Sequence, residues 1–91
     1  MRKYIIERDI PDVDRLNAAE LRGAAQASMA ALAQLAPRVQ WVESFVVRNK
    51  TFCVYLAEDE ALIHEHAKLS GFPANKVSEV ARKIDPTTAG A

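Results

Sequence analysis

The pattern of apolar and polar positions along the chain predicts four strands separated by two helices. Short runs rich in β-branched and aromatic residues indicate the strands, and apolar residues at helical spacing indicate the helices. The predicted strands cover residues 2–8, 39–47, 51–57 and 77–84. The predicted helices run from Asn17 to Ala36 and from residues 58–59 to Ser70. The chain therefore alternates as strand, helix, strand, strand, helix, strand.

Both helices carry signals that define their ends. Asn17 is followed three residues later by Glu20, and this spacing predicts a capping box at the start of the first helix. A stripe of mainly apolar residues at helical spacing follows, formed by Leu21, Ala25, Ser28, Leu32 and Leu35. Gly71 comes directly after the second helix and suits a left-handed C-cap. We therefore expect two well-defined helices.

This order of elements is the ferredoxin-like βαββαβ pattern, because right-handed crossovers leave few other arrangements. We expect an α+β fold in which two helices cover one face of a four-stranded antiparallel sheet. Residues 1–85 form this single domain, and residues 86–91 form a flexible C-terminal tail. The other face of the sheet then lacks a cover within the chain.

The side chains on that open face depend on the register of the central hairpin, because a slip of one residue exchanges the two faces of a strand. An odd-numbered loop groups a nearly all-aliphatic set under the helices: Val42, Ser44, Val46, Phe52, Val54 and Leu56. The open face then carries Trp41, Glu43, Phe45, Cys53 and Tyr55, near Glu7. We expect Trp41, Phe45 and Tyr55 to form a dimer interface between two sheets, as in dimeric α/β-barrels.

Composition and charge exclude several classes of function. The acidic and basic residues of this 91-residue chain cancel, so no net field favours nucleic acid or an anionic membrane surface. The apolar run that begins at Tyr4 stops at Glu7, which is too short for a signal peptide or a membrane span. The lone Cys53 cannot form an internal disulfide, and a free thiol suits a reducing compartment. We therefore expect a cytoplasmic protein that binds neither nucleic acid nor membranes.

Four residues are candidate metal ligands. Thiolate and imidazole groups suit divalent ions such as nickel and zinc, which indicates Cys53 and His66. The predicted register places these two on opposite sides of the sheet, so the simpler interpretation is a buried thiol and a hydrogen-bonded core histidine. Glu60 and His64 lie four residues apart on an exposed helical face and offer a surface metal site. A solvated helix face is the simpler interpretation of that pair.

The predicted open face also suggests a catalytic alternative. Glu43 lies among aromatic residues, and a carboxylate in an apolar pocket is the kind of group that transfers protons in enzymes. Tyr55 and His66 complete this candidate catalytic set. The simpler interpretation of Glu43 is an interface ion pair with an arginine such as Arg82. The chain contains no glycine-rich phosphate loop, paired-cysteine zinc motif or nucleophile elbow.

Six segments together resemble a known family. They are residues 4–8 (YIIER), 39–46 (VQWVESFV), 53–57 (CVYLA), 65–67 (EHA), 71–74 (GFPA) and 84–87 (IDPT). The chain is similar over nearly its whole length to a family of small bacterial proteins long catalogued as a domain of unknown function, with nickel-binding members from actinobacteria. The resemblance implies a ferredoxin-like homodimer with a part in nickel sequestration, and it makes Cys53 and His66 family-like positions.

Three functional hypotheses follow. The first, which we favour, is a non-enzymatic cytoplasmic homodimer that takes up nickel or a similar divalent ion through histidine and carboxylate groups. The second is a cofactor-independent enzyme resembling the dimeric α/β-barrel monooxygenases and cyclases, with a pocket formed by Trp41, Glu43, Tyr55 and His66. The third is an interaction module without a ligand. Selective metal uptake would favour the first, and a closed apolar cavity would favour the second.

Overall fold

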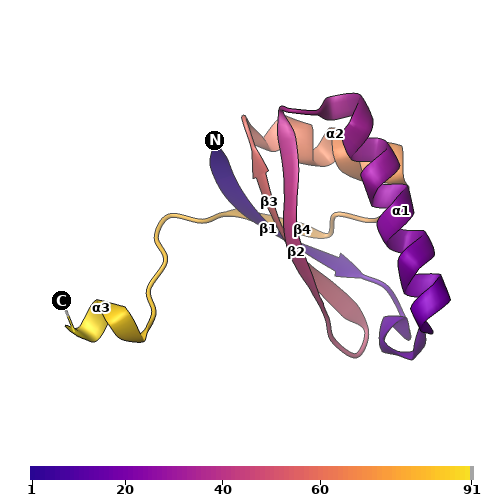
Figure 1. The fold of residues 1–91 in the computed structure, drawn as a ribbon, viewed down its shortest axis with the longest axis horizontal. Coiled ribbons are helices and arrows are strands. Elements are labelled where there is room, and N and C mark those ends of the chain that lie inside the picture. Colours follow the sequence, from indigo (N-terminus) through magenta and orange to yellow (C-terminus); the bar gives the residue numbers. More distant parts are fainter. Residues whose placement is uncertain (91) are drawn as a thin grey trace.

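The computed structural model describes residues 1–90 and has a layer of helices on one face of a sheet (Figure 1). In chain order the elements are β1 (Arg2–Asp9), the 3-10 helix η1 (Val13–Arg15), α1 (Ala18–Leu35), β2 (Val39–Val46), β3 (Lys50–Ala57), α2 (Glu60–Ser70), β4 (Lys76–Glu79) and α3 (Pro86–Gly90). The predicted succession of strands and helices is confirmed, and η1 and α3 are additions to it.

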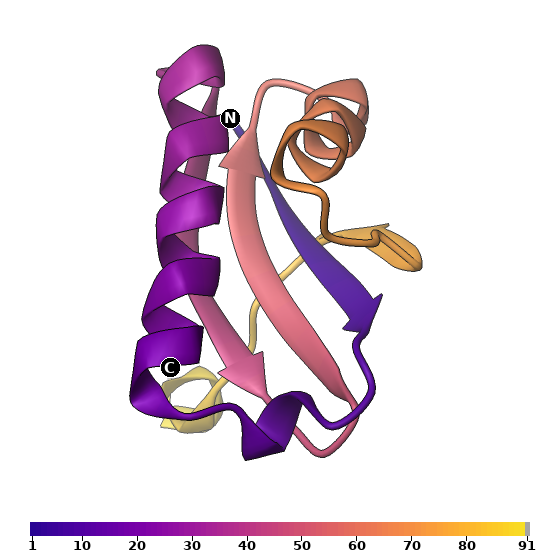
Figure 2. The same ribbon diagram turned by 90° about the vertical axis from the view of Figure 1, so that its right-hand side faces the viewer.

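The sheet has the strand order β2-β3-β1-β4, and all neighbouring strands are antiparallel. Helices α1 and α2 cover the same face of this sheet (Figure 2). The ferredoxin-like α+β fold predicted from the sequence is therefore confirmed. No helix within residues 1–90 combines the length and the hydropathy that crossing a bilayer requires.

The helix ends form as their sequence signals predict. The Glu20 amide donates to Asn17 Oδ1 at 2.8 Å, and the Asn17 amide donates to Glu20 Oε1 at 3.0 Å. This reciprocal pair is the expected capping box, and it satisfies two amides that the first turn of α1 leaves free. At α2, Asp59 accepts a hydrogen bond from the Leu62 amide at 3.1 Å. Gly71 ends α2 with φ of 81°, the predicted left-handed cap.

The hairpin register predicted from the sequence is wrong. Strands β2 and β3 are joined by the two residues Arg48 and Asn49, because the Val47 amide donates to the Lys50 carbonyl at 3.0 Å. An even-numbered loop pairs Val46 with Thr51, so the β3 residues exchange faces relative to the prediction. Cys53 and Tyr55 thus lie under the helices and not on the open face, and Phe52, Val54 and Leu56 lie on the open face.

The predicted position of Trp41 on the open face is also wrong, because β2 contains a bulge. The pairing shifts between Trp41 and Glu43, so Val42 is an extra residue in β2. Trp41 pairs with Tyr55, and Ser44 pairs with Cys53. Trp41 therefore shares the helix-covered face with Ser44 and Val46, whereas Glu43 and Phe45 stay on the open face as predicted.

The core lies between the helices and the sheet. Its buried members come from five elements: Tyr4, Ile6, Leu32, Val39, Cys53, Tyr55, Ala57, Leu62 and Ile63. The open face keeps exposed apolar side chains, including those of Ile5 and Phe45. Phe45 is 54% exposed, so no other part of residues 1–90 covers its side chain on this face.

The C-terminal segment departs from its predicted structure. Strand β4 stops at Glu79, although the pattern predicted a strand through Ile84, and Ile84 is 80% exposed. The chain then leaves the domain on the side of the sheet opposite α1 and α2 and ends in α3 (Figure 1). Asp85 accepts a hydrogen bond from the Thr87 amide at 2.9 Å at the start of this short helix. The flexibility predicted for the tail, and the domain boundary at residue 85, remain predictions.

Candidate functional site

A buried polar network connects α1, β3 and α2. His66, on the inner side of α2, is only 1% exposed. Its Nε2 lies 3.1 Å from Ser28 Oγ of α1, and the same Oγ lies 3.1 Å from the Tyr55 hydroxyl of β3. The ring centroids of Tyr55 and His66 are 4.9 Å apart. The structure therefore brings together two residues of the catalytic alternative, and adds Ser28 between them.

Burial shifts the pKa values of both ionisable groups in this network toward the neutral form. The pKa of His66 falls to about 4, mainly because burial disfavours the imidazolium and secondly because the positive charge of Arg8 is near. Burial likewise raises the pKa of Tyr55, although its bond with Ser28 opposes the change. At neutral pH the network therefore consists of an uncharged imidazole, a hydroxyl and a phenol.

Glu43 does not join this network. It pairs with Val54 on the open face of the sheet, whereas Tyr55 and His66 lie on the helix-covered face. The set of Glu43, Tyr55 and His66 is therefore not assembled within one chain. Among residues 1–90, no ion pair links Glu43 to Arg82.

Cys53 and His66 lie on the same side of the sheet, which corrects the prediction that the sheet separates them. Cys53 is a buried free thiol whose Sγ is 3.5 Å from Thr51 Oγ1. Within residues 1–90, however, no three His, Cys, Asp or Glu side chains converge on one point. A metal ion held by Cys53 or His66 would thus lack a full set of protein ligands.

His64 and Glu60 form the solvent-accessible pair that their spacing predicts. His64 Nε2 and Glu60 Oε2 are 3.1 Å apart, and both side chains are about half exposed. Two ligand atoms that occupy neighbouring corners of an octahedral ion, each about 2.1 Å from it, are about 3 Å apart. The pair thus has the separation of two adjacent metal ligands, and a bound ion would replace the hydrogen bond that now joins them. It supplies only two ligands, so water or another molecule must supply the rest.

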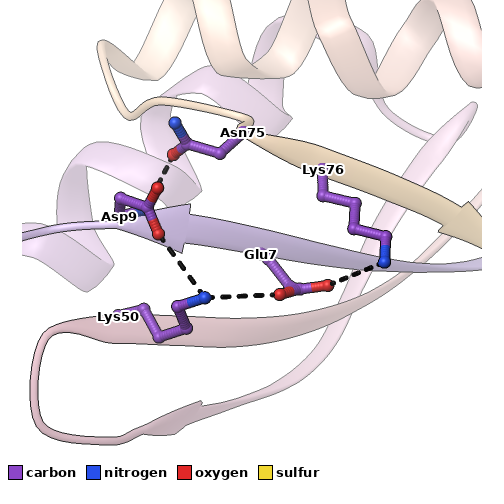
Figure 3. Close-up of polar contacts among 5 residues, drawn as sticks. All are labelled: Glu7, Asp9, Lys50, Asn75 and Lys76. Atoms are coloured by element: carbon purple, nitrogen blue, oxygen red, sulfur yellow. Dashed lines mark hydrogen bonds and ion pairs between the residues drawn. The ribbon is translucent and has the colours of Figure 1, made fainter.

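Another charged cluster lies on the open face, at the β1–β3–β4 end shown in Figure 3. Lys50 Nζ lies 3.5 Å from Glu7 and 3.6 Å from Asp9, and Lys76 Nζ lies 3.9 Å from Glu7. The backbone amide of Asp9 donates to the Asn75 side chain at 2.7 Å. Because each carboxylate already faces a lysine, this cluster is a balanced ion-pair network and a poor cation site.

The three residues predicted to form the dimer interface lie on different faces of the sheet. Phe45 lies exposed on the open face, where a second copy could reach it. Tyr55 is 2% exposed under the helices, and Trp41 stacks on it with ring centroids 6.4 Å apart. Of the three residues, Phe45 is the one whose side chain is available to a partner sheet.

Two of the four residues predicted to form a pocket, Trp41 and Tyr55, line a cavity, and sequence reasoning missed the charged residue in its wall. A cavity of about 330 Å³ lies between α1, η1 and the sheet, and Arg8, Ser28, Trp41 and Tyr55 line part of it. One signal for Arg8 was present in the sequence. It follows Tyr4 and Ile6 at strand spacing, so it shares their buried face.

Comparisons with known proteins support the fold and indicate a family. A family model described as "Nickel responsive protein SCO4226-like" matches residues 4–80. The crystal structure of SCO4226 from Streptomyces coelicolor A3(2) resembles this one with a TM-score of 0.71 at 16% sequence identity. The match covers 90% of this chain and 99% of that chain. At this identity it shows a shared fold alone. A search of curated proteins gave no match.

Proposed function

This chain belongs to the SCO4226-like family of nickel responsive proteins, and we propose that it is a non-enzymatic protein that binds nickel or a similar divalent ion. The family match over residues 4–80 is the observation that carries this proposal. We propose that the protein binds the ion in order to sequester it. The free thiol of Cys53 fits a reducing compartment, so the cytoplasm is the proposed location.

The ligands proposed for the ion are His64 and Glu60 of α2. Their ligand atoms have the separation of adjacent octahedral positions and face solvent, and imidazole and carboxylate are suitable ligands for nickel. His66 and Cys53 are buried, so binding there would require the core to open. We therefore rank the buried pair below the exposed pair. Two protein ligands give modest affinity unless a second chain adds more.

A second copy of the chain is the proposed partner. The open face carries exposed apolar side chains at Ile5 and Phe45, and a patch of this kind on a small protein marks an association site. Two such faces packed together would form a symmetric dimer of the dimeric α/β-barrel type. Helix α2 lies on the other side of the sheet (Figure 2), so this dimer leaves His64 accessible.

Calorimetric titration of tag-free, chelator-stripped protein with nickel tests the metal proposal. We expect saturable binding, weakened at least about tenfold by His64→Ala because one of two protein ligands is lost. Glu60→Gln should weaken binding in the same direction. Glu65→Gln is the matched control, because Glu65 is an exposed carboxylate of the same helix and should leave the affinity unchanged.

Two outcomes would contradict this assignment. Absence of saturable nickel binding by the wild-type protein would remove the metal proposal itself. Binding that survives His64→Ala but is lost in His66→Gln or Cys53→Ser would move the site to the buried pair. A parallel titration with zinc measures whether the site prefers nickel.

A further inference from the structure

The cavity beneath α1 lies apart from the proposed nickel ligands. Most of its wall is apolar, with contributions from Ile10, Val13, Leu16, Leu21, Val46 and Phe72. Its volume of about 330 Å³ lies near the lower end of the range for small-molecule pockets. Small residues of α1, Ala24 and Ala25, form part of its wall and leave room that longer side chains would fill.

Arg8 is the one charged residue among the residues that line this cavity. It lies on β1 opposite Thr51 and is only 3% exposed. Its Nη1 donates to the Pro73 carbonyl at 2.9 Å and to the Phe72 carbonyl at 3.5 Å. Within residues 1–90 no carboxylate forms an ion pair with it. The guanidinium is therefore a buried charge without a counter-ion.

Part of this guanidinium remains open to the cavity. A guanidinium has five N–H donors, and both of its hydrogen bonds to backbone carbonyls use Nη1. The guanidinium carbon also lies 6.0 Å from the centroid of the Tyr55 ring, which lines the same cavity. The remaining nitrogens of the guanidinium therefore lie on the cavity side, close to Tyr55. Since Arg8 lines the cavity and is otherwise buried, the cavity is the route by which another molecule reaches them.

The charge balance of the cavity selects the class of ligand. A buried charge without a counter-ion is unfavourable even where backbone carbonyls accept hydrogen bonds from it, and a bound anion would offset that cost. Arg8 supplies a single positive charge, so a single negative charge balances it, whereas a phosphate dianion would leave an unpaired charge in an apolar site. A carboxylate also matches the planar donors of a guanidinium. The hydroxyl groups of Ser28 and Tyr55 in the same wall are further hydrogen-bonding groups.

We propose that this cavity binds a small monocarboxylic acid with an apolar aromatic or aliphatic body, whose carboxylate pairs with Arg8. The apolar body replaces water against the walls from α1, η1 and β2. This binding site is independent of nickel, because it shares no residue with the exposed pair on α2. It therefore stands or falls separately from the metal proposal.

Fluorescence titration with phenylacetate and its uncharged analogue phenylacetamide tests this proposal. Trp41 is the only tryptophan of the chain and lines the cavity, so its emission should report on occupancy. In buffer with chelator, we expect saturable binding of phenylacetate at least about tenfold tighter than of phenylacetamide, because only the acid pairs with the guanidinium.

Two variants distinguish the contribution of the Arg8 charge to ligand binding from the contribution of the space in the cavity. Arg8→Gln should abolish the preference for the acid, and Arg48→Gln, a change in the exposed hairpin loop, should preserve it. Ala25→Leu narrows the cavity and leaves Arg8 in place, so it should abolish binding of both probes. Because Arg8 also holds the Phe72–Pro73 backbone, circular dichroism must show that its variant folds. If it does not fold, Ala25→Leu still tests occupancy of the cavity.

Three results would overturn the proposal. They are the absence of saturable phenylacetate binding by the wild-type protein, equal affinity of the wild-type protein for acid and amide, and unchanged phenylacetate affinity in a folded Arg8→Gln variant. Binding of phenylacetate that Ala25→Leu does not affect would also count against it, because the probe would then occupy another site.

Discussion

At the scale of single residues, the buried polar network is the feature with the largest effect on protonation. Ser28, Tyr55 and His66 come from three different elements, and each is hydrogen-bonded within the network. A hydrogen-bonded network of this kind stabilises one arrangement of the packed elements, because a partner that moves away leaves a buried polar group unsatisfied. The neutral form of His66 is part of that arrangement.

The free energy of unfolding should therefore fall as the pH is lowered from about 6.5 to about 4. The pKa of His66 is about 4 in the folded protein and has its ordinary value of 6.5 in the unfolded chain. Between these two pH values the unfolded chain therefore binds a proton that the folded chain does not. The full difference corresponds to about 3 kcal/mol. Urea titrations at a series of pH values and fixed protein concentration would measure it.

The variant His66→Gln isolates this contribution from the titration of carboxylates. Its loss of stability over the same pH range should be smaller than that of the wild-type protein by about 3 kcal/mol. His64→Gln, which changes the exposed histidine of the same helix, should keep the wild-type dependence. An identical pH dependence in all three proteins would contradict the neutral, buried imidazole.

At the scale of elements, one glycine stabilises the end of its helix and another weakens the interior of its helix. Gly71 ends α2 with φ of 81°, a conformation that residues with a Cβ rarely adopt. Gly23 lies exposed within α1, where a Cβ would meet no atom within 4 Å. The first glycine is required by the backbone, and the second only reduces helix propensity.

Replacing each glycine by alanine should change stability in opposite directions. Gly71→Ala should lower the free energy of unfolding by about 1 kcal/mol or slightly more, because alanine in the left-handed region is strained. Gly23→Ala should raise it by about 0.5–1 kcal/mol through helix propensity. Denaturant titrations of the two variants control for each other, since neither methyl group meets a neighbouring atom within 4 Å. Equal shifts would contradict the argument from backbone conformation.

At the scale of the whole molecule, the two faces of the sheet have different solvent exposure. The helices bury one face, and the other leaves apolar side chains of β1 and β2 exposed. A short chain buries a smaller fraction of its surface than a large one. Association with a second copy would therefore bury apolar surface that folding alone leaves exposed. A stable dimer typically buries about 1,600 Å² in total, and the open face is the surface that we propose for it.

Phe45→Lys should shift the protein from dimer to monomer. A lysine at the centre of packed apolar faces would be a buried unpaired charge, and we expect dimer affinity to fall at least about tenfold. Sedimentation analysis over a concentration series measures the change. Met29→Lys is the control, because Met29 is equally exposed but lies on α1. A wild-type protein that is monomeric at all concentrations would contradict the dimer.

The candidate sites were predictable only in part. The spacing of Glu60 and His64 predicted their contact, because four residues on one helix bring two side chains together. The roles of Arg8 and Ser28 could not be read from such local spacing. Their partners are 65 and 38 residues away in the chain, and only packing brings α1 and α2 against the sheet.

The sequence alone determined the order of elements, the capping box at Asn17 and the left-handed cap at Gly71, because these depend on local spacing and backbone conformation. It could not determine which face of β3 is buried. Thr51, Cys53 and Tyr55 alternate with Phe52, Val54 and Leu56, so both faces of that strand are largely apolar and alternation does not distinguish them. The tertiary structure decided the register through the two-residue loop and the bulge at Val42. In that register Tyr55 lies beside His66.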